Sequence, residues 1–243
     1  MYLHLFLLPF IVRSFKLVER DQTKLQTHEG IKIHNVNVIQ NNYTFQESVA
    51  LEVTSSLIIT DSYFFSNRGS DEEPGAIKAN GNYDLTIFNT KFINNSGIYR
   101  GGALCLEVST FNITECFFSK NECFDQNPDP EKVSRGGAIY FAQKSNFHLI
   151  DYCIFDQNIA KTAGGSIFVY FNPNKNLKLL EFSDYINITN CQFNSSRSQE
   201  FGGAISCGYQ LSGKITDGDM KIESCLFSQC FSGNGGAIYF QEG

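Results

Sequence analysis

One short order of apolar and polar positions recurs along most of the chain. Counted from a recurring Phe, mostly apolar residues stand seven and five positions before it, a small residue stands two before it, and Asn or a small residue stands three after it. Successive copies are 26 to 38 residues apart, a period typical of solenoids. The residues at the Phe position are Val38, Phe64, Phe92, Phe118, Phe155, Phe193 and Phe227.

Strand periodicity converts this order into coils. Side chains alternate between faces along a strand, so positions −7 and −5 share one face and positions −2 and 0 share one face. Both pairs are apolar or small and must point inward, so polar residues between them, such as Thr60-Asp61 and Thr114-Glu115, predict a corner.

A second motif, Gly-Gly-Ala-Ile or a close relative, follows each Phe-x-x-Asn segment and predicts a third short strand. Its last residue is expected inward, at Ile77, Leu104, Ile139, Ile167, Ile205 and Ile238. Three strands and three corners make one turn of a three-sided coil. The sequence therefore predicts an all-β right-handed parallel β-helix of about seven coils.

Stacking such coils about 4.8 Å apart places like residues on one another. We expect Phe and Ile ladders, an Asn column joined amide to amide, and a sharp bend at the double Gly where a Cβ would clash. Phe155 is expected inward and Tyr140 outward, so truncation of Tyr140 should cost far less stability than truncation of Phe155. His148 falls in an inward apolar column and is interpreted as a core histidine.

The ends of the chain suggest a secreted protein. Residues 1–14 resemble a signal peptide, although a short apolar leader packed on the end of the coil is the alternative. Residues 15–30 are expected to be a lead-in or cap, and residues 31–243 the repeat domain, which is expected to continue beyond this chain. Because no other segment reaches about 18 apolar residues, no membrane span is expected.

Composition narrows the chemistry. Hydrophobic residues make up 42% of the chain, which excludes disorder, and the net charge of −6 is spread without a basic stripe, which argues against nucleic acid. Eight Cys occur without a C-x-x-C pair, and four of them occupy position −2: Cys116, Cys153, Cys191 and Cys225. We therefore expect buried, reduced thiols, with no metal site and no cofactor.

Within each aligned column, acids do not occur on neighbouring coils. The acids at position −4 are Asp151 and Glu223, those at −3 are Asp61 and Glu115, and in each pair a coil without an acid intervenes. Glycoside chemistry needs acids or bases close together, so no catalytic residue is predicted. The alternative is a pectate-lyase-like polysaccharide lyase or hydrolase on the same scaffold.

Asn-x-Ser/Thr sequons make the chain a candidate glycoprotein, with chance in an Asn-rich sequence as the alternative. Asn112 and Asn187 are the better candidates because position −6 lies between two inward columns and faces solvent. The candidate sites are Asn42, Asn94, Asn112, Asn187 and Asn194.

Three insertions exceed the minimal coil, around residues 123–135, 172–184 and 208–219. The second and third follow the Gly-Gly strand on neighbouring coils, so we expect them to share one edge and to bind a partner. The alternatives are plain surface loops, or an extra strand at residues 177–182. The candidate binding residues are Lys175, Lys178, Leu180, Phe182, Tyr209, Leu211 and Lys214.

The pairing of Gly-Gly-Ala-Ile with Phe-x-x-Asn resembles the repeat of the chlamydial polymorphic outer membrane proteins, which is also found in trichomonad surface proteins. The likeness covers the chain from about Ile31 to its end. It implies a secreted or surface-displayed protein with an adhesin-like role. The implied partner is a host or cell-surface protein or glycan.

Overall fold

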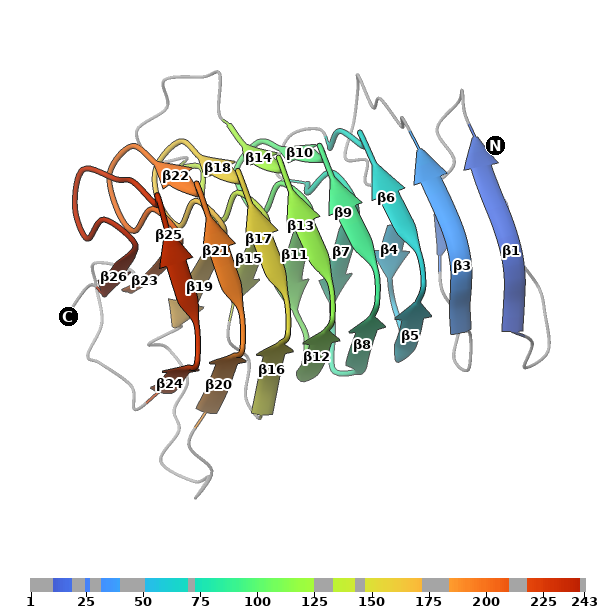
Figure 1. Ribbon diagram of the computed structural model, residues 1–243. Coiled ribbons are helices and arrows are strands. Elements are labelled where there is room, and N and C mark those ends of the chain that lie inside the picture. Colours follow the sequence, from blue (N-terminus) through green and yellow to red (C-terminus); the bar gives the residue numbers. More distant parts are fainter. Residues whose placement is uncertain are drawn as a thin grey trace.

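The chain forms a right-handed parallel β-helix, as predicted. The computed structural model describes residues 11–18, 25–26, 32–39, 51–69, 73–124, 133–142, 147–171, 184–209 and 218–240, in which every named element is a strand and every strand pairing is parallel. In Figure 1 the front strands run upward, the chain passes over the top and returns at the back, and the coils advance from the N-terminal to the C-terminal end. This winding is right-handed.

The strands of each coil fall into rows, which we call faces. The first face consists of β5 (Leu57–Thr60), β8 (Asp84–Phe88), β12 (Thr110–Thr114), β16 (Phe147–Asp151), β20 (Asp184–Thr189) and β24 (Gly218–Glu223). The second face consists of β6 (Tyr63–Phe65), β9 (Lys91–Ile93), β13 (Phe117–Ser119), β17 (Ile154–Asp156), β21 (Gln192–Asn194) and β25 (Leu226–Ser228). The long strand β3 (Lys32–Ile39) pairs with both faces and joins them into one 14-stranded sheet.

The Gly-Gly-Ala-Ile segments form the third face. It consists of β2 (Leu25–Gln26), β4 (Leu51–Val53), β7 (Ile77–Asn80), β11 (Leu104–Glu107), β15 (Ile139–Ala142), β19 (Ile167–Phe171), β23 (Ile205–Tyr209) and β26 (Ile238–Phe240). A fourth row of two-residue strands, not predicted from the sequence, follows the second face: β10 (Ser96–Gly97), β14 (Glu122–Cys123), β18 (Ile159–Ala160) and β22 (Arg197–Ser198).

The predicted columns are in register from coil to coil. The residues at the Phe position pair successively from Val38 to Phe227, and the third-face column pairs successively from Leu51 to Ile238. Both columns lie in the core. The stacked Phe rings lie 4.8 to 5.0 Å apart between centroids, with interplanar angles of 4° to 11°.

The predicted Asn column is a continuous buried hydrogen-bond ladder. Each Asn Nδ2 donates to the Oδ1 of the Asn on the next coil, from Asn67 to Asn95, Asn121 and Asn158, at 2.9 to 3.0 Å. At Asn121 the amide is fully used, because Nδ2 also donates to the carbonyl of Phe92 and Oδ1 also accepts the Asn95 backbone N–H. Buried amides satisfied in this way hold one coil in register on the next.

The ladder continues by a substitution. Ser196 takes the Asn position on the following coil, and Ser166 takes the Ala position of the Gly-Gly motif beside it. Their hydroxyl oxygens lie 2.7 Å apart, and Asn158 Nδ2 is 3.3 Å from Ser166 Oγ. Two small polar residues therefore replace one amide in the core.

The corners between the faces use left-handed backbone. At position −3 the φ angles lie between 44° and 55°, at Asp61, Asn89, Glu115, Tyr152, Asn190 and Ser224. At position +2 they lie between 52° and 57°, at Ser66, Asn94, Lys120, Gln157, Ser195 and Gln229. The sequence predicted the first corner from its polar residues and a further corner at the Asn after the Phe strand, but it did not predict the left-handed residue at position +2.

The two glycines of each Gly-Gly pair serve different purposes. Gly136 has a φ of +71°, which a side chain rarely allows. A Cβ on Gly137 would lie 2.0 Å from the carbonyl oxygen of Gly165 on the next coil and 2.6 Å from the backbone of Ile159. The second glycine is thus required by the close approach of the fourth row, and the predicted clash is confirmed.

The Cys column faces the core as predicted, with Cys225 at its last coil only partly buried. All eight Cys are free thiols, and Cys116, Cys153 and Cys191 are almost completely buried. Each thiol in the column donates to the carbonyl two residues before it, as the hydroxyls of Ser62 and Thr90 do on earlier coils. Burial raises the pKa of the Cys153 thiol. These thiols behave as small buried donors that replace Ser and Thr.

A second packed layer covers the outside of the third face. Tyr140 points outward as predicted but is only 4% exposed, so an outward position does not leave this side chain open to solvent. Its ring lies 5.8 Å from that of Phe168, and the guanidinium of Arg100 sits 5.5 Å from its centroid. Arg135 covers Phe168 in the same way, at 5.0 Å. We call Cys105, Tyr140, Ala163 and Phe168, with the arginines over them, the outer layer.

Strand pairing begins before the repeat recognised in the sequence. In β1 (Ile11–Val18), Leu17 pairs with Val38, and in β2, Leu25 pairs with Leu51. Residues 11–14 of the expected signal peptide lie in β1, and residues 1–10 lie outside the described residues. No helix able to cross a membrane occurs in the described part of the chain.

Candidate binding surface

The predicted binding edge falls mainly on residues that the structure does not describe. Six of the seven predicted residues lie outside the described residues: Lys175, Lys178, Leu180, Phe182, Leu211 and Lys214. The seventh, Tyr209, is the last residue of β23, and only its backbone is described. The strands that flank the insertions are described. Because β19 pairs with β23 and β20 pairs with β24, both insertions leave the third face and enter the first face on neighbouring coils.

The outer surface of the first face lies directly beside these attachment points. Its outward columns are offset by two residues along each strand, at positions −8, −6 and −4. They contain Asp84, Thr110, Phe147 and Tyr185; Thr86, Asn112, Leu149, Asn187 and Lys221; and Phe88, Thr114, Asp151, Thr189 and Glu223. We call this the first-face outer surface. It mixes hydroxyls, amides and carboxylates with aromatic rings.

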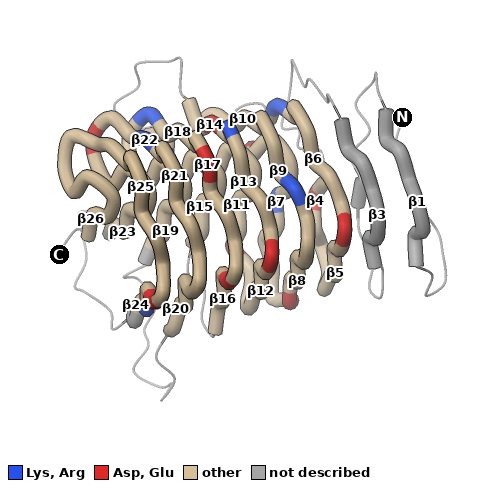
Figure 2. The backbone as a smooth tube through the Cα atoms, in the orientation of Figure 1, with Lys and Arg blue, Asp and Glu red and all other residues tan. Residues whose placement is uncertain are grey.

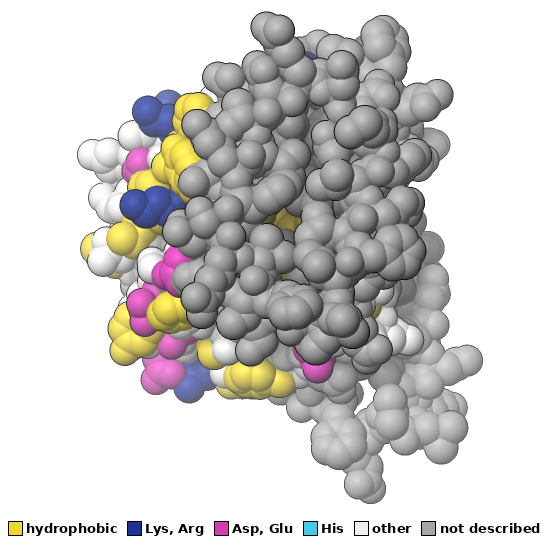
Figure 3. Space-filling model, turned by 90° about the vertical axis from the view of Figure 1, so that its right-hand side faces the viewer, with side chains coloured by type: hydrophobic (Ala, Val, Ile, Leu, Met, Phe, Trp, Pro, Cys, Tyr) yellow, Lys and Arg dark blue, Asp and Glu magenta, His cyan; other side chains and the backbone are white. Residues whose placement is uncertain are grey.

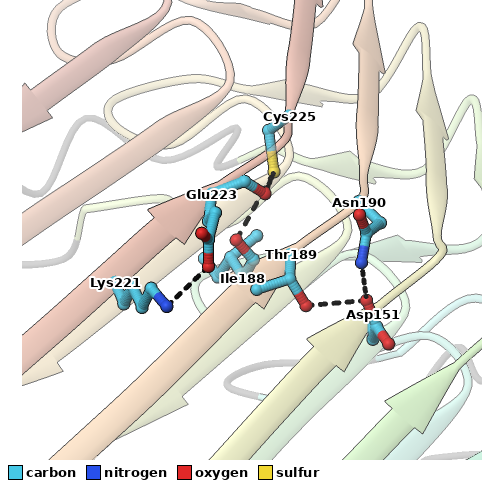
Figure 4. Close-up of polar contacts among 7 residues, drawn as sticks. All are labelled: Asp151, Ile188, Thr189, Asn190, Lys221, Glu223 and Cys225. Atoms are coloured by element: carbon cyan, nitrogen blue, oxygen red, sulfur yellow. Dashed lines mark hydrogen bonds and ion pairs between the residues drawn. The ribbon is translucent and has the colours of Figure 1, made fainter.

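Two carboxylates on this surface, those of Asp151 and Glu223, have hydrogen-bond or ion-pair partners on the same or the next coil. Asp151 Oδ1 accepts a hydrogen bond from the Thr189 hydroxyl at 2.6 Å and one from Asn190 Nδ2 at 2.9 Å, both on the next coil (Figure 4). Glu223 forms an ion pair with Lys221 at 2.5 Å on the same strand, and this hydrogen bond raises the pKa of Lys221. These contacts fix the two carboxylates in place.

The four acids considered from the sequence line the corner below the second face. Figure 2 shows acidic residues spaced along this corner. Asp61, like Asp151, accepts a hydrogen bond from the next coil, which has no acid in that column: Asn89 Nδ2 donates to Asp61 Oδ1 at 2.6 Å. The intervening coil therefore supplies hydrogen-bond donors to a carboxylate where a paired acid site would supply a second carboxylate.

Two aromatic rings stand at the start of the first face. Phe147 and Tyr185 pair in register, and their rings lie 6.2 Å apart with an interplanar angle of 16°. Phe147 remains 49% exposed, although it occupies a strand position. The preceding residues of this column, Thr110 and Asp84, are short and hydrogen-bonded to each other. Along this column, short polar side chains on two coils are thus followed by large aromatic side chains on the next two.

The sequence reasoning missed this aromatic pair. The repeat recognised in the sequence begins at position −7, whereas Phe147 and Tyr185 stand at −8 on consecutive coils. The available signal was an aromatic residue at the same offset in two adjacent repeats, on the outward side of the strand. Figure 3 shows hydrophobic, basic and acidic side chains side by side on the part of the surface that is coloured.

The sequons differ in their surroundings. Asn112 is exposed, and the Thr114 hydroxyl of its own sequon donates to its Oδ1 at 2.6 Å. At Asn187 the Oδ1 is buried and the sequon hydroxyl of Thr189 is bonded to Asp151. Asn112 is therefore the better presented of these two.

Asn94 is exposed and Asn194 is half-buried. The Nδ2 of Asn94 donates to Ser66 Oγ at 2.9 Å, and Ser196 of the Asn194 sequon is fully buried. Asn42 lies outside the described residues. Glycosylation remains a prediction at all five sequons.

His148 is fully buried in the inward column where the sequence placed it. Its ring contacts those of Phe111 and Phe141, with centroids 4.6 and 4.4 Å away. Within the described residues, no group of three or more His, Cys, Asp or Glu side chains is arranged to hold a metal ion.

Comparison of the chain with protein-family models, curated proteins and solved structures gives no significant match. The resemblance to the polymorphic outer membrane protein repeat therefore stays a prediction that rests on the two motifs. The geometry of the first-face outer surface and of the insertion edge is the basis for a functional proposal.

Proposed function

We propose that this chain is a secreted or cell-surface β-helix with a structural, adhesin-like role, which binds a protein or glycan on a host or neighbouring cell. The observation that carries the proposal is that each coil has two kinds of position, inward ones that recur from coil to coil and outward ones that vary. Inward columns and corners are occupied by ladders that every coil shares. Outward positions and insertions differ from coil to coil, so they can be specialised for contact without cost to the stack.

The insertion edge supports the same role. Two insertions join the third face to the first face at adjacent positions of neighbouring coils, where β19 pairs with β23 and β20 with β24. Insertions at one corner of adjacent coils lie side by side and add surface that regular turns do not provide. The predicted contact residues Tyr209 and Lys214 belong to one of these insertions.

The alternative is a polysaccharide lyase or hydrolase. Asp151 and Glu223 sit in one column with Thr189 between them, so their strands are about 9.6 Å apart at the usual spacing. Asp151 accepts two hydrogen bonds from the intervening coil and Glu223 is ion-paired on its own strand, so neighbouring side chains already engage both carboxylates. This arrangement supports the binding role more than a pair of catalytic acids.

The chain itself provides the variant that tests attachment. The third face joins the first face through Val108-Ser109 on another coil, between Glu107 and Thr110. Residues 171–184 and 209–218 can each be replaced by this Val-Ser connection without a change of register, because Tyr170 and Gly208 occupy the position equivalent to Glu107. We expect the variant to keep its β-sheet circular dichroism and to lose attachment to cells.

A matched control uses the insertion at a different corner. Residues 124–134 can be replaced by the Lys161-Thr162 dipeptide that connects Ala160 to Ala163 on the next coil. This control should attach like the wild type. Undiminished attachment of the double-insertion variant would refute a binding role for that edge, and failure of the wild-type protein to attach to any cell type would refute the adhesin-like function.

A further inference from the structure

We propose that the first-face outer surface beside Phe147 and Tyr185 is a binding site for a neutral hexose glycan. The inference rests on the proposed function and names its ligand class. It is carried by the described first-face strands alone and does not use the insertions.

The first step is the exposed aromatic pair. The Phe147 side chain is 49% exposed, and contact of this apolar area with water is unfavourable. Burial of the same area by a ligand would therefore favour binding. The adjacent Tyr185 ring, at 6.2 Å and 16°, extends the apolar surface across two coils. A pyranose ring has a face of C–H bonds that packs against aromatic rings, while its hydroxyls remain at the rim.

The second step is the polar part of the same surface. Beside Phe147 the column drops to Thr110 and Asp84, and the next column carries the exposed amide of Asn112. Small-molecule sites combine an apolar surface with a few fixed polar groups that orient the ligand. The Thr110–Asp84 and Thr114–Asn112 hydrogen bonds hold these groups in place before a ligand arrives.

The third step is charge. Among the described residues, this surface carries the carboxylates of Asp84, Asp151 and Glu223, and its cation Lys221 is already paired with Glu223. Carboxylates accept hydrogen bonds from sugar hydroxyls, whereas uronate, sialate or sulfate groups would meet like charge. The surface therefore favours a neutral glycan over an acidic one, in contrast to the acidic substrates of pectate-lyase-like enzymes.

The fourth step is spacing. Strands of the first face repeat at about 4.8 Å along the rod. A hexose unit in an extended chain has a comparable length, so a glycan that runs along the rod meets one strand per sugar. Phe147 and Tyr185 would contact neighbouring sugars of one chain.

The test is a titration of the full chain with hexasaccharides, followed by isothermal calorimetry. The probes are the neutral hexamers of β-1,4-linked glucose and of mannose, and the hexamer of galacturonate as the acidic probe of equal length. We expect saturable binding of at least one neutral hexamer, weaker or no binding of the galacturonate hexamer, and about a tenfold loss of affinity in Phe147→Ala. Tyr185→Ala should weaken the same probe.

Phe124→Ala is the matched control, since Phe124 is 40% exposed and follows β14 in the fourth row, off the first-face outer surface. Its affinity should equal that of the wild type, and thermal unfolding should show that all three variants are folded. No binding of either neutral hexamer, preference for galacturonate, or equal affinity of Phe147→Ala and wild type would each overturn the proposal. Wild-type protein that attaches to cells yet binds no neutral hexamer would leave the adhesin-like function intact and remove only this site.

Discussion

The Phe ladder inside the coil and the outer layer over the third face are both buried, but for different reasons. In the ladder, like rings stack because the register repeats one residue at one position, as from Phe118 to Phe155. In the outer layer, unlike residues are covered by side chains that reach over from the preceding turn, as Arg100 does over Tyr140. Facing inward and being buried are thus separate properties of a residue in this fold.

The difference also separates what each layer can tolerate. A ladder position has the same neighbours above and below on every coil, so a change at one coil disturbs two stacked contacts. An outer-layer position depends on a single covering side chain, and that side chain differs between coils. We therefore expect the ladder to carry more of the stability, and four measurements rank the two layers.

The largest loss is expected at the centre of the ladder. Phe155→Ala removes a fully buried ring that stacks on Phe118 and Phe193, and it should reduce the free energy of unfolding by about 3 to 5 kcal/mol. Urea denaturation gives the value. Tyr152→Ala, at a 61% exposed position three residues away, is the control and should change stability by less than about 0.5 kcal/mol.

The Asn ladder should be nearly as sensitive. Asn121→Ala leaves the Asn95 backbone N–H without its acceptor, removes one of the two acceptors of Asn95 Nδ2 and removes one donor to Asn158 Oδ1, so a loss of about 3 kcal/mol is expected. Asn121→Ser should recover part of it, because Ser196 occupies this position on a later coil. Equal urea midpoints for the Ala and Ser variants would contradict a hydrogen-bonding role.

The outer layer should give an intermediate loss. Tyr140→Ala removes a ring that packs on Phe168 under Arg100, and we expect about 2 kcal/mol, more than at exposed Tyr152 and less than at Phe155. The same urea titrations measure it. A value close to that of Tyr152→Ala would mean that Arg100 does not hold the layer together in solution.

The smallest expected effect is the change of unfolding free energy with pH that is due to one thiol in each layer. Burial raises the pKa of the Cys153 thiol in the inward column and of the Cys105 thiol in the outer layer, above the ordinary value of 9.0. Above pH 9 the unfolded chain releases these protons while the folded chain keeps them, so stability is full below pH 9 and falls as pH rises. Each thiol should contribute about 1.4 kcal/mol per pH unit.

Unfolding in urea with a reductant at pH 8 and pH 10 measures this slope. Cys153→Ser and Cys105→Ser should each make it shallower, and Ser already occupies the Cys153 column at Ser62. An unchanged slope in both variants would show that these thiols do not titrate on unfolding.

The sequence alone determined the fold class and the inward columns. A parallel stack places each coil on its neighbour in register, so the requirements of the core appear as the same residue at the same offset, from Phe64 to Phe227 and from Ile77 to Ile238. The predicted Asn ladder and the buried Cys column followed from the same repetition. Position in the repeat was enough to assign these residues.

Only the tertiary structure decided the left-handed residue at the second corner, the outer layer and the exposed aromatic pair. Lys120 and Gln157 are not residues that favour a left-handed backbone, a conformation that costs about 1 to 2 kcal/mol. Each adopts it because its N–H donates to the next coil, to Asp156 and Asn194 at 2.9 and 2.8 Å. The left-handed backbone depends on contacts between coils, whereas the covering arginines and the aromatic pair each recur on only two coils, so the repeat shared by all coils does not include them.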